Sequence, residues 1–272
     1  MKEGLIQKMS AVLSTPVEYS LPIGGELVSL NPYIGKTIKL SYLGNIHCSN
    51  CGKKTKKSYS QGYCYPCMAK LAQCDLCIMK PETCHYHLGT CREPEWGEQF
   101  CFQDHYVYLA NSSGLKVGIT RHTQVPTRWI DQGATQALPI FKVKTRLQSG
   151  QVETVLKQYV ADKTDWRKML KGMSEPKDLV EERDRLLAIA SEELEALQRA
   201  NGEAQIELLT DAKPIDIEYP VLEYPTKVSS LNFDKNPIVE GVLMGIKGQY
   251  LIFDKGVLNI RKFGSYQLQF DA

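Results

Sequence analysis

The chain has 272 residues, of which 43% are hydrophobic, and its formal charge at pH 7 is +2. This length allows one large core or two modest ones, and so small a net charge points to no class of binding partner. No apolar run is long enough to span a membrane, and the N-terminal residues lack the apolar centre of a signal peptide. We therefore expect a cytoplasmic protein that does not enter a membrane.

The sequence pattern predicts an α+β fold. We expect a small mixed sheet with flanking helices, a zinc ribbon, and a β-rich layer or small barrel made by the two chain ends. In chain order, the expected segments are an N-terminal β segment (1–46), a zinc-binding region (47–105), a compact α+β unit (106–172), a long amphipathic helix (173–203) and a C-terminal β module (204–272). Residues 35–43 alternate polar and apolar side chains, as a strand does.

Two Cys-x-x-Cys pairs follow the first segment. Cys48 and Cys51 are separated by twelve residues from Cys64 and Cys67. Pairs at this spacing can place four thiolates tetrahedrally around one Zn²⁺, whereas a redox-active dithiol is the weaker alternative. Four thiolates leave no open coordination position, so we expect a structural role for this ion.

A basic loop separates the two pairs. It carries lysines close to an aromatic ring, namely Lys53, Lys54, Lys56, Lys57 and Tyr59. Cationic side chains that contact phosphates, together with rings that stack on bases, are typical of nucleic-acid binding. The alternatives are a solvated loop that keeps the ribbon soluble, or a ribbon that docks on another protein.

Eight further potential metal ligands follow within a short stretch: Cys74, Cys77, Cys84, His85, His87, Cys91, Cys101 and His105. Together with the first four cysteines they could hold two or three structural zinc ions. Cys74 and Cys77 form a third pair, and Cys101 with His105 could complete their site. Each histidine could instead be a hydrogen-bonded structural residue, and the spacing leaves the pairing open.

The next stretch predicts a β-hairpin. Residues 106–110 and 115–120 alternate in character, and Asn111-Ser112-Ser113-Gly114 suits the turn between them. One face of the pair is apolar, and the other carries Tyr106, Tyr108, Lys116, Gly118 and Thr120. That polar face could bind a ligand, or it could belong to an ordinary half-exposed hairpin.

Two arginines, Arg121 and Arg128, follow the hairpin on either side of Pro126. Residues 140–147 alternate again and predict a third strand, after which apolar residues at helical spacing predict a helix that begins at Ser149-Gly150. Glu153 lies in the first turn of this helix. It could serve a ligand site or form an ordinary i, i+4 pair with Lys157.

This order of elements resembles the GIY-YIG nuclease superfamily. Tyr106-Val107-Tyr108 looks like its GIY element and Lys116-Val117-Gly118 like its YIG element. Arg128 resembles the catalytic arginine of that family, and Glu153 resembles its metal-binding glutamate. Lys116 replaces the YIG tyrosine, Tyr106 stands at the glycine of GIY, and a longer spacing from Gly118 to Arg128 makes Arg121 a rival.

The resemblance implies a divalent-metal-dependent phosphodiesterase. Glu153 would bind Mg²⁺ or Mn²⁺, Arg128 would offset charge on the phosphoryl group, and Tyr108, with Lys116 or Tyr106, would help to activate water. The resemblance covers residues 105–172. The whole chain is also similar to an uncharacterised bacterial family of zinc-containing proteins.

The remaining third of the chain predicts support elements. Residues 176–201 predict one long helix with an apolar stripe and an acidic opposite face. Residues 241–261 are rich in β-branched side chains and glycines, and we expect them to pair with the N-terminal strands.

Two functions from different classes are compatible with these patterns. The first is a metal-dependent nuclease of GIY-YIG type that acts on DNA or RNA. The second is a non-catalytic zinc-ribbon module that binds nucleic acid or a protein through a degenerate nuclease fold. The sequence does not choose between DNA and RNA and does not fix the oligomeric state.

Overall fold

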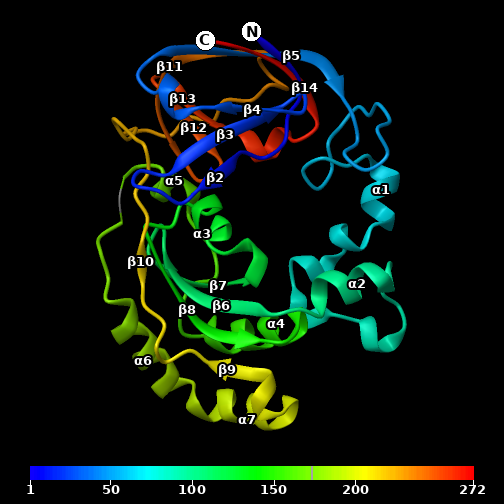
Figure 1. The fold of residues 1–272 in the computed structure, drawn as a ribbon, viewed down its shortest axis with the longest axis vertical. Coiled ribbons are helices and arrows are strands. Elements are labelled where there is room, and N and C mark those ends of the chain that lie inside the picture. Colours follow the sequence, from blue (N-terminus) through cyan, green and yellow to red (C-terminus); the bar gives the residue numbers. More distant parts are fainter. Residues whose placement is uncertain (173) are drawn as a thin grey trace.

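The computed structural model describes residues 1–172 and 174–272. As predicted, the fold is α+β, with three antiparallel sheets. Residues near the two chain ends form two of these sheets, here called the β body, and the middle of the chain forms the third, the central sheet (Figure 1). Residues 47–104, here called the arm, join the β body to the central sheet along one side of the molecule.

The β body contains a six-stranded and a three-stranded sheet. The order in the larger sheet is β1 (Lys2–Leu5), β14 (Tyr266–Asp271), β5 (Thr37–Ile46), β11 (Ile238–Lys247), β12 (Tyr250–Phe253) and β13 (Gly256–Asn259). The smaller sheet consists of β2 (Ser10–Val12), β3 (Glu18–Ile23) and β4 (Glu26–Ser29). The two chain ends therefore meet in one layer, as expected. This layer is open, with β1 and β13 at its edges, and is not the barrel that was the other expectation.

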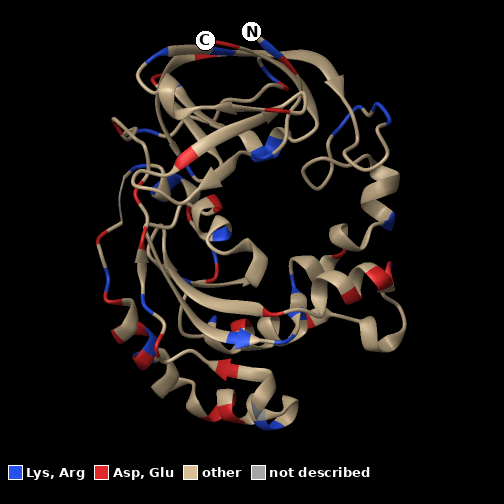
Figure 2. Ribbon diagram, in the orientation of Figure 1, with Lys and Arg blue, Asp and Glu red and all other residues tan. Residues whose placement is uncertain are grey.

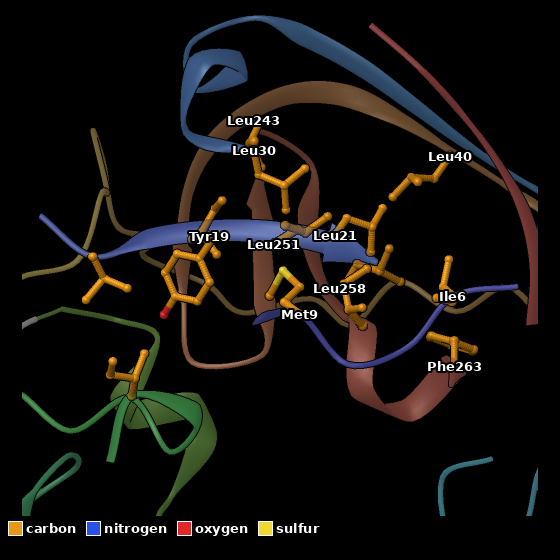
Figure 3. Close-up of a cluster of buried hydrophobic side chains, with 14 of the residues drawn as sticks. Ile6, Met9, Tyr19, Leu21, Leu30, Leu40, Leu243, Leu251, Leu258 and Phe263 are labelled. Carbon is orange, nitrogen blue, oxygen red and sulfur yellow. The ribbon is translucent and has the colours of Figure 1, made fainter. Parts of the chain in front are cut away.

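The core of the β body lies between its two sheets. Alternate residues of β3 point inward, so that Tyr19, Leu21 and Ile23 are buried. They pack with Leu30 of the following loop and Leu251 of β12 (Figure 3). Each fully buried leucine contributes about 1.5–3 kcal/mol of hydrophobic stabilisation, which explains why two chain ends remote in sequence stay together.

The central sheet has the order β10 (Ile215–Asp216), β8 (Gln136–Val143), β6 (His105–Asn111) and β7 (Leu115–Arg121), and β9 (Ile206–Leu208) also pairs with β8. The hairpin of β6 and β7 confirms the prediction. All ladders in this sheet are antiparallel, so the expected mixed sheet is wrong in that respect. A single parallel bridge joins Lys116 to Ala161 at its edge.

Helix α4 (Arg146–Leu156) begins earlier than the expected Ser149. The Thr145 hydroxyl accepts a hydrogen bond from the Gln148 amide, and the Gln148 side chain accepts one from the Thr145 amide. This reciprocal capping satisfies two backbone donors and fixes the first turn. It also explains why the third strand ends at Val143, whereas the alternating pattern predicted strand up to Leu147.

Three helices cover one face of the central sheet. Helix α4 packs there with α6 (Leu179–Ile189) and α7 (Ser191–Asn201). The single helix expected over 176–201 is broken at Ala190, which is buried and has φ −99° and ψ 15°. The break lets α7 contact α4, and exposed acidic side chains cover its outer face (Figure 2). Met173, the first residue of the expected helical segment, lies outside the described residues.

The opposite face of the central sheet packs against the β body. Helix α3 (Thr127–Asp131) supplies the buried Trp129 and Ile130, which share one core with Tyr108 and Leu251. The polar face expected for the hairpin is therefore buried: Tyr108 is 0% exposed and Lys116 is 4% exposed. The pattern alone failed here because it does not show that a second sheet covers this face.

Short elements complete the fold. The arm contains α1 (Tyr65–Lys70), α2 (Pro94–Cys101) and the single turns η2 (Ala72–Cys74), η3 (Leu76–Ile78), η4 (Pro81–Thr83) and η5 (Tyr86–Leu88). Elsewhere lie α5 (Trp166–Met169), η1 (Asn31–Tyr33), η6 (His122–Gln124), η7 (Glu203–Gln205) and η8 (Ile260–Phe263). None of the helices in the described part of the chain has the length and apolar character that a bilayer crossing requires.

Candidate functional site

The first cysteine quartet converges as the spacing predicts. The sulfurs of Cys48, Cys51, Cys64 and Cys67 all lie within 4.8 Å of one another. Cys48 follows the end of β5, and Gly52 (φ +70°) closes the first turn through a 2.8 Å hydrogen bond from its amide to the Cys48 carbonyl. Cys64 stands at the start of α1, which places Cys67 on its first turn. This cluster could hold a structural zinc ion.

The backbone around Cys48 favours the thiolate form of this residue. Burial opposes ionisation of Cys48, but hydrogen bonds with the backbone at Cys64, Cys51 and Asn50 outweigh burial and lower its pKa to about 6. The Asn50 side-chain amide also donates to the Cys67 sulfur at 3.4 Å. Donors aimed at sulfur stabilise the deprotonated form that binds metal.

The basic loop between the pairs is on the surface. The four lysines at positions 53, 54, 56 and 57 are exposed. The Lys57 ammonium lies 5.4 Å from the centre of the Tyr59 ring, which meets Tyr65 edge to face. No ion pair engages these lysines among the described residues, so their charges are available to an anionic partner.

The structure separates the other eight predicted ligands into groups. The side chains of Cys77, Cys84, Cys91 and Cys101 line one small cavity in the arm. Cys74 lies outside it, because its thiol interacts with Ser60 and Arg92. The spacing of Cys74 and Cys77 therefore does not bring these two side chains to one centre.

None of the three histidines lines this cavity, although His85 lies beside it. His85 is close to Asp75, with 3.5 Å between Nε2 and Oδ2, and its Nδ1 meets Thr90 Oγ1 at 2.8 Å. His87 is exposed. His105 is 1% exposed and donates from Nδ1 to the Gln103 carbonyl at 2.7 Å, and burial lowers its pKa to about 4.

The residues singled out by the nuclease resemblance come together in a second place, at the central sheet. Tyr108 of β6 lies directly opposite Gly118 of β7. A Cβ added to Gly118 would lie 2.7 Å from the Tyr108 hydroxyl oxygen, so only glycine lets the ring cross the neighbouring strand. The hydroxyl donates to Gln132 Oε1 at 3.0 Å, and the Arg128 guanidinium interacts with the same phenol.

Lys116 and Glu153 reach this tyrosine from two other elements. Glu153, half-buried on α4, interacts electrostatically with Tyr108 and with Lys116 of β7. Asp162 joins them from the segment that pairs with β7, where the Val117 amide donates to the Ala161 carbonyl at 2.8 Å. The cluster of Tyr108, Lys116, Arg128, Glu153 and Asp162 is called the charged cluster below.

Burial shifts the pKa of three members of the charged cluster, Tyr108, Lys116 and Glu153. It raises the pKa of Tyr108 to about 12 and lowers that of Lys116 to about 8, where the Arg128 charge acts in the same direction. It raises the pKa of Glu153 to about 7, with a further contribution from the Asp162 carboxylate. Perturbed groups of opposite type within one cluster are typical of functional sites.

The rival residues occupy other surroundings. The Arg121 guanidinium lies over the Phe100 ring, 5.2 Å from its centre, and interacts with Cys101 and Arg146 at the arm. The Tyr106 side chain is half-buried and interacts with Lys142. Neither contributes to the perturbed pKa values of Tyr108, Lys116 or Glu153, so Arg128 and Tyr108 are the members that the fold brings into the charged cluster.

Two members of this neighbourhood were missed by sequence reasoning. Gln132 is the C-terminal cap of α3, and Asp162 lies after α4 in a segment without helical or strand periodicity. No local pattern marks either residue, because each reaches Tyr108 or Glu153 only through the tertiary fold.

Comparison with known proteins places the chain in a family. No curated protein and no solved structure matches the chain. A family model described as "Protein of unknown function (DUF2797)" matches residues 35–268, which spans the last strands of the β body, the arm and the central sheet. The chain therefore belongs to the DUF2797 family.

Proposed function

We propose that this protein is a divalent-metal-dependent phosphodiesterase that cleaves nucleic acid. The observation that carries the proposal is the charged cluster: Tyr108, Lys116, Arg128 and Glu153 come from four different elements, β6, β7, α3 and α4, and interact at one place. A cluster that combines a buried lysine, an arginine and two carboxylates is typical of functional sites.

The residues present fit a divalent cation. The Asp162 carboxylate is close enough to raise the pKa of Glu153, and two carboxylates so placed can supply oxygen ligands to Mg²⁺ or Mn²⁺. When bound, the ion supplies Lewis-acid stabilisation of charge on a phosphodiester. Glu153 would be its principal ligand, because it is the more buried of the two.

The cationic side chains would bind the scissile phosphate. Arg128 is half-buried, and no carboxylate among the described residues forms an ion pair with it. Arg261 of η8 interacts with Arg128, and its Nε donates to Gln61 at the start of the arm. Two guanidiniums from the central sheet and the β body would thus meet a phosphate backbone.

The proton acceptor would be Lys116. It stands where the resembled family has a tyrosine, and its pKa of about 8 leaves part of the population neutral at mildly alkaline pH. Tyr108 is a poor acceptor, because burial raises its pKa and its hydroxyl already donates to Gln132. Tyr108 would instead hold Arg128 and Gln132 in place.

The test is cleavage of labelled single- and double-stranded DNA and RNA with Mg²⁺ or Mn²⁺. We expect cleavage by the wild type, a loss of at least a hundredfold in Glu153→Gln, and unchanged cleavage in Glu192→Gln, a matched change at an exposed glutamate of α7. Zinc content is measured on all samples to detect misfolding. A zinc-replete wild type that cleaves nothing would overturn the proposal, as would equal cleavage by Glu153→Gln.

A second candidate function is binding without cleavage. The exposed lysines of the arm, with Lys57 over Tyr59, favour a module that binds nucleic acid or an acidic protein surface. Binding by both wild type and Glu153→Gln, without cleavage and with a steep loss of affinity at high salt, would favour this function.

A further inference from the structure

The arm encloses a small cavity of about 20 Å³. Four cysteines line it, each from a different part of the arm: Cys77 in η3, Cys84 at the end of η4, Cys91 before α2, and Cys101 as the last residue of α2. The first three recur every seven residues. Apolar side chains, among them Ile78, Trp96 and Phe102, form the rest of the wall.

The four cysteine side chains line the same cavity. Cys77 interacts electrostatically with Cys84 and Cys101, and Cys101 interacts with Cys84 and Cys91. None of the four has a hydrogen-bond partner among the residues that the structure describes. Four thiols gathered without partners around a cavity are not explained by packing, since the hydrogen-bonding capacity of each sulfur is left unused.

The arm also lacks the apolar core that would otherwise order it. Within residues 71–104, all of which are described, only Ala72, Pro81 and Gly97 are buried. A stretch of short turns with so little buried apolar surface needs a cross-link, and small segments of this kind are commonly held by a structural metal.

We propose that Cys77, Cys84, Cys91 and Cys101 bind a second Zn²⁺ ion as four thiolates. Tetrahedral sulfur sites hold either zinc or an iron–sulfur cluster. The cavity has room for about one water-sized sphere, which suits a single ion and is too small for a cluster. This inference stands independently of the proposed nuclease activity.

The surrounding charges favour such a site. One Zn²⁺ with four thiolates carries a net charge of −2, and Arg146 and Arg121 both interact with Cys101. Arg146 Nη2 also donates to the carbonyl of Ile78, next to Cys77, at 2.9 Å. Two guanidiniums therefore offset the charge of the thiolates where the site meets α4.

A competing donor set lies beside the cavity. Oxygen, sulfur and nitrogen atoms of Asp75, Cys77 and His85 lie within 4.8 Å of one another. Asp75, however, already pairs with Arg92 at 2.7 Å and accepts from the Leu76 amide, and His85 is held by Thr90. We therefore infer that Asp75 and His85 stabilise the backbone of the arm and do not bind the metal.

The second ion would also fix the arm on the helix that carries Glu153. Gly150 of α4 faces η4 so closely that an added Cβ would lie 2.6 Å from the Glu82 amide nitrogen. Lys157 of α4 pairs with Glu82 at 3.5 Å. Because η4 lies between Cys77 and Cys84, a metal that joins these cysteines holds the surface on which α4 rests.

Metal stoichiometry tests the proposal. We expect two Zn²⁺ per chain in the purified wild type by inductively coupled plasma mass spectrometry. Cys84→Ser and Cys101→Ser should each lose one ion, whereas Cys74→Ser and His85→Ala should keep both. A wild type with one ion would overturn the proposal, and loss of the second ion in His85→Ala but not in Cys91→Ser would overturn the all-thiolate set.

Alkylation of the folded wild type gives an answer that does not depend on variants that fail to fold. With zinc bound, we expect eight of the nine cysteines to resist a thiol reagent, so that Cys74 alone is labelled. After chelation, Cys77, Cys84, Cys91 and Cys101 should also react. Labelling of these four in the zinc-replete protein, located by peptide mass spectrometry, would contradict the second site.

Discussion

Two neighbouring stretches of this chain, the arm (47–104) and the central sheet with α4 (105–156), differ in how they are ordered. In the sheet, Val107, Leu109 and Val117 are each 0% exposed and pack on α4. In the arm beyond α1, almost no side chain is buried. Eight cysteines of the whole arm gather in two groups of four. The sheet is held by burial of apolar surface, whereas we infer that the arm is held by metal.

The difference matters because the two stretches meet at the charged cluster. Helix α4 contributes Val152 and Leu156 to the core of the sheet and Gly150 to the contact with the arm. Glu153 lies between these contacts on the same helix. Its position therefore depends both on hydrophobic packing and on the arm. Each prediction below concerns a change in one of the two stretches and its effect on the other.

Removal of zinc should have the largest effect and should be confined to the arm. A structural zinc site contributes about 10–16 kcal/mol to the folding of its segment. After chelation, or in Cys48→Ser/Cys51→Ser, we expect rapid proteolysis within residues 47–104 and slow cleavage within 105–156. Mass spectrometry of the fragments locates the cuts. Equal resistance of both stretches to proteolysis after metal loss would show that the arm is not held by metal.

Leu109→Ala should lower the stability of the whole molecule. Leu109 is 0% exposed in the core between the sheet and its helices. Truncation of a buried leucine costs about 2–5 kcal/mol, which denaturant unfolding measures. Met79→Ala, at an arm residue that is 82% exposed, is the control and should change the free energy of unfolding by less than about 0.5 kcal/mol. Similar effects of both changes would show that the arm also depends on a core.

Gly150→Ala tests the contact between the two stretches. At an ordinary helical position this change stabilises by about 1 kcal/mol. Here the new Cβ would approach the backbone of Glu82 and the Pro81 side chain, within 2.6–2.7 Å. We expect a net destabilisation of about 1–3 kcal/mol and faster hydrogen exchange in η4, with zinc content unchanged. A stabilised variant would show that the arm does not rest on α4.

Glu153→Gln should have the smallest effect, and its sign depends on pH. The pKa of Glu153 in the folded protein is raised from 4.5 to about 7. The wild type is therefore more stable while this carboxyl is protonated, and it loses that stability as the pH rises from about 4.5 to 7. Glutamine removes this cost. We expect the variant to gain about 1 kcal/mol over the wild type at pH 8 and nothing at pH 4.5, as measured by thermal unfolding. A variant less stable than the wild type at pH 8 would show that Glu153 is satisfied by an ion pair.

The sequence by itself determined the features that depend on residues close to one another in the chain. The spacing of Cys48, Cys51, Cys64 and Cys67 predicted the first quartet, because two short turns suffice to aim four sulfurs at one point. Alternation predicted the hairpin of β6 and β7. The resemblance to the nuclease family, and not the pattern alone, singled out Tyr108, Lys116, Arg128 and Glu153. The predicted start of α4, Ser149, was three residues late, because the periodicity of apolar residues does not show the capping box that Thr145 and Gln148 form.

Only the tertiary structure decided which distant groups meet. It assigned Cys77, and not Cys74, to the second cavity, while Cys74 interacts with Ser60 and Arg92. It buried the polar face of the hairpin, where Tyr108 joins the core of the β body and Lys116 is 4% exposed. It also brought Asp162 to Glu153. Burial and charge interactions depend on what surrounds a side chain in space. The sequence of one strand does not show which other sheet will pack against it.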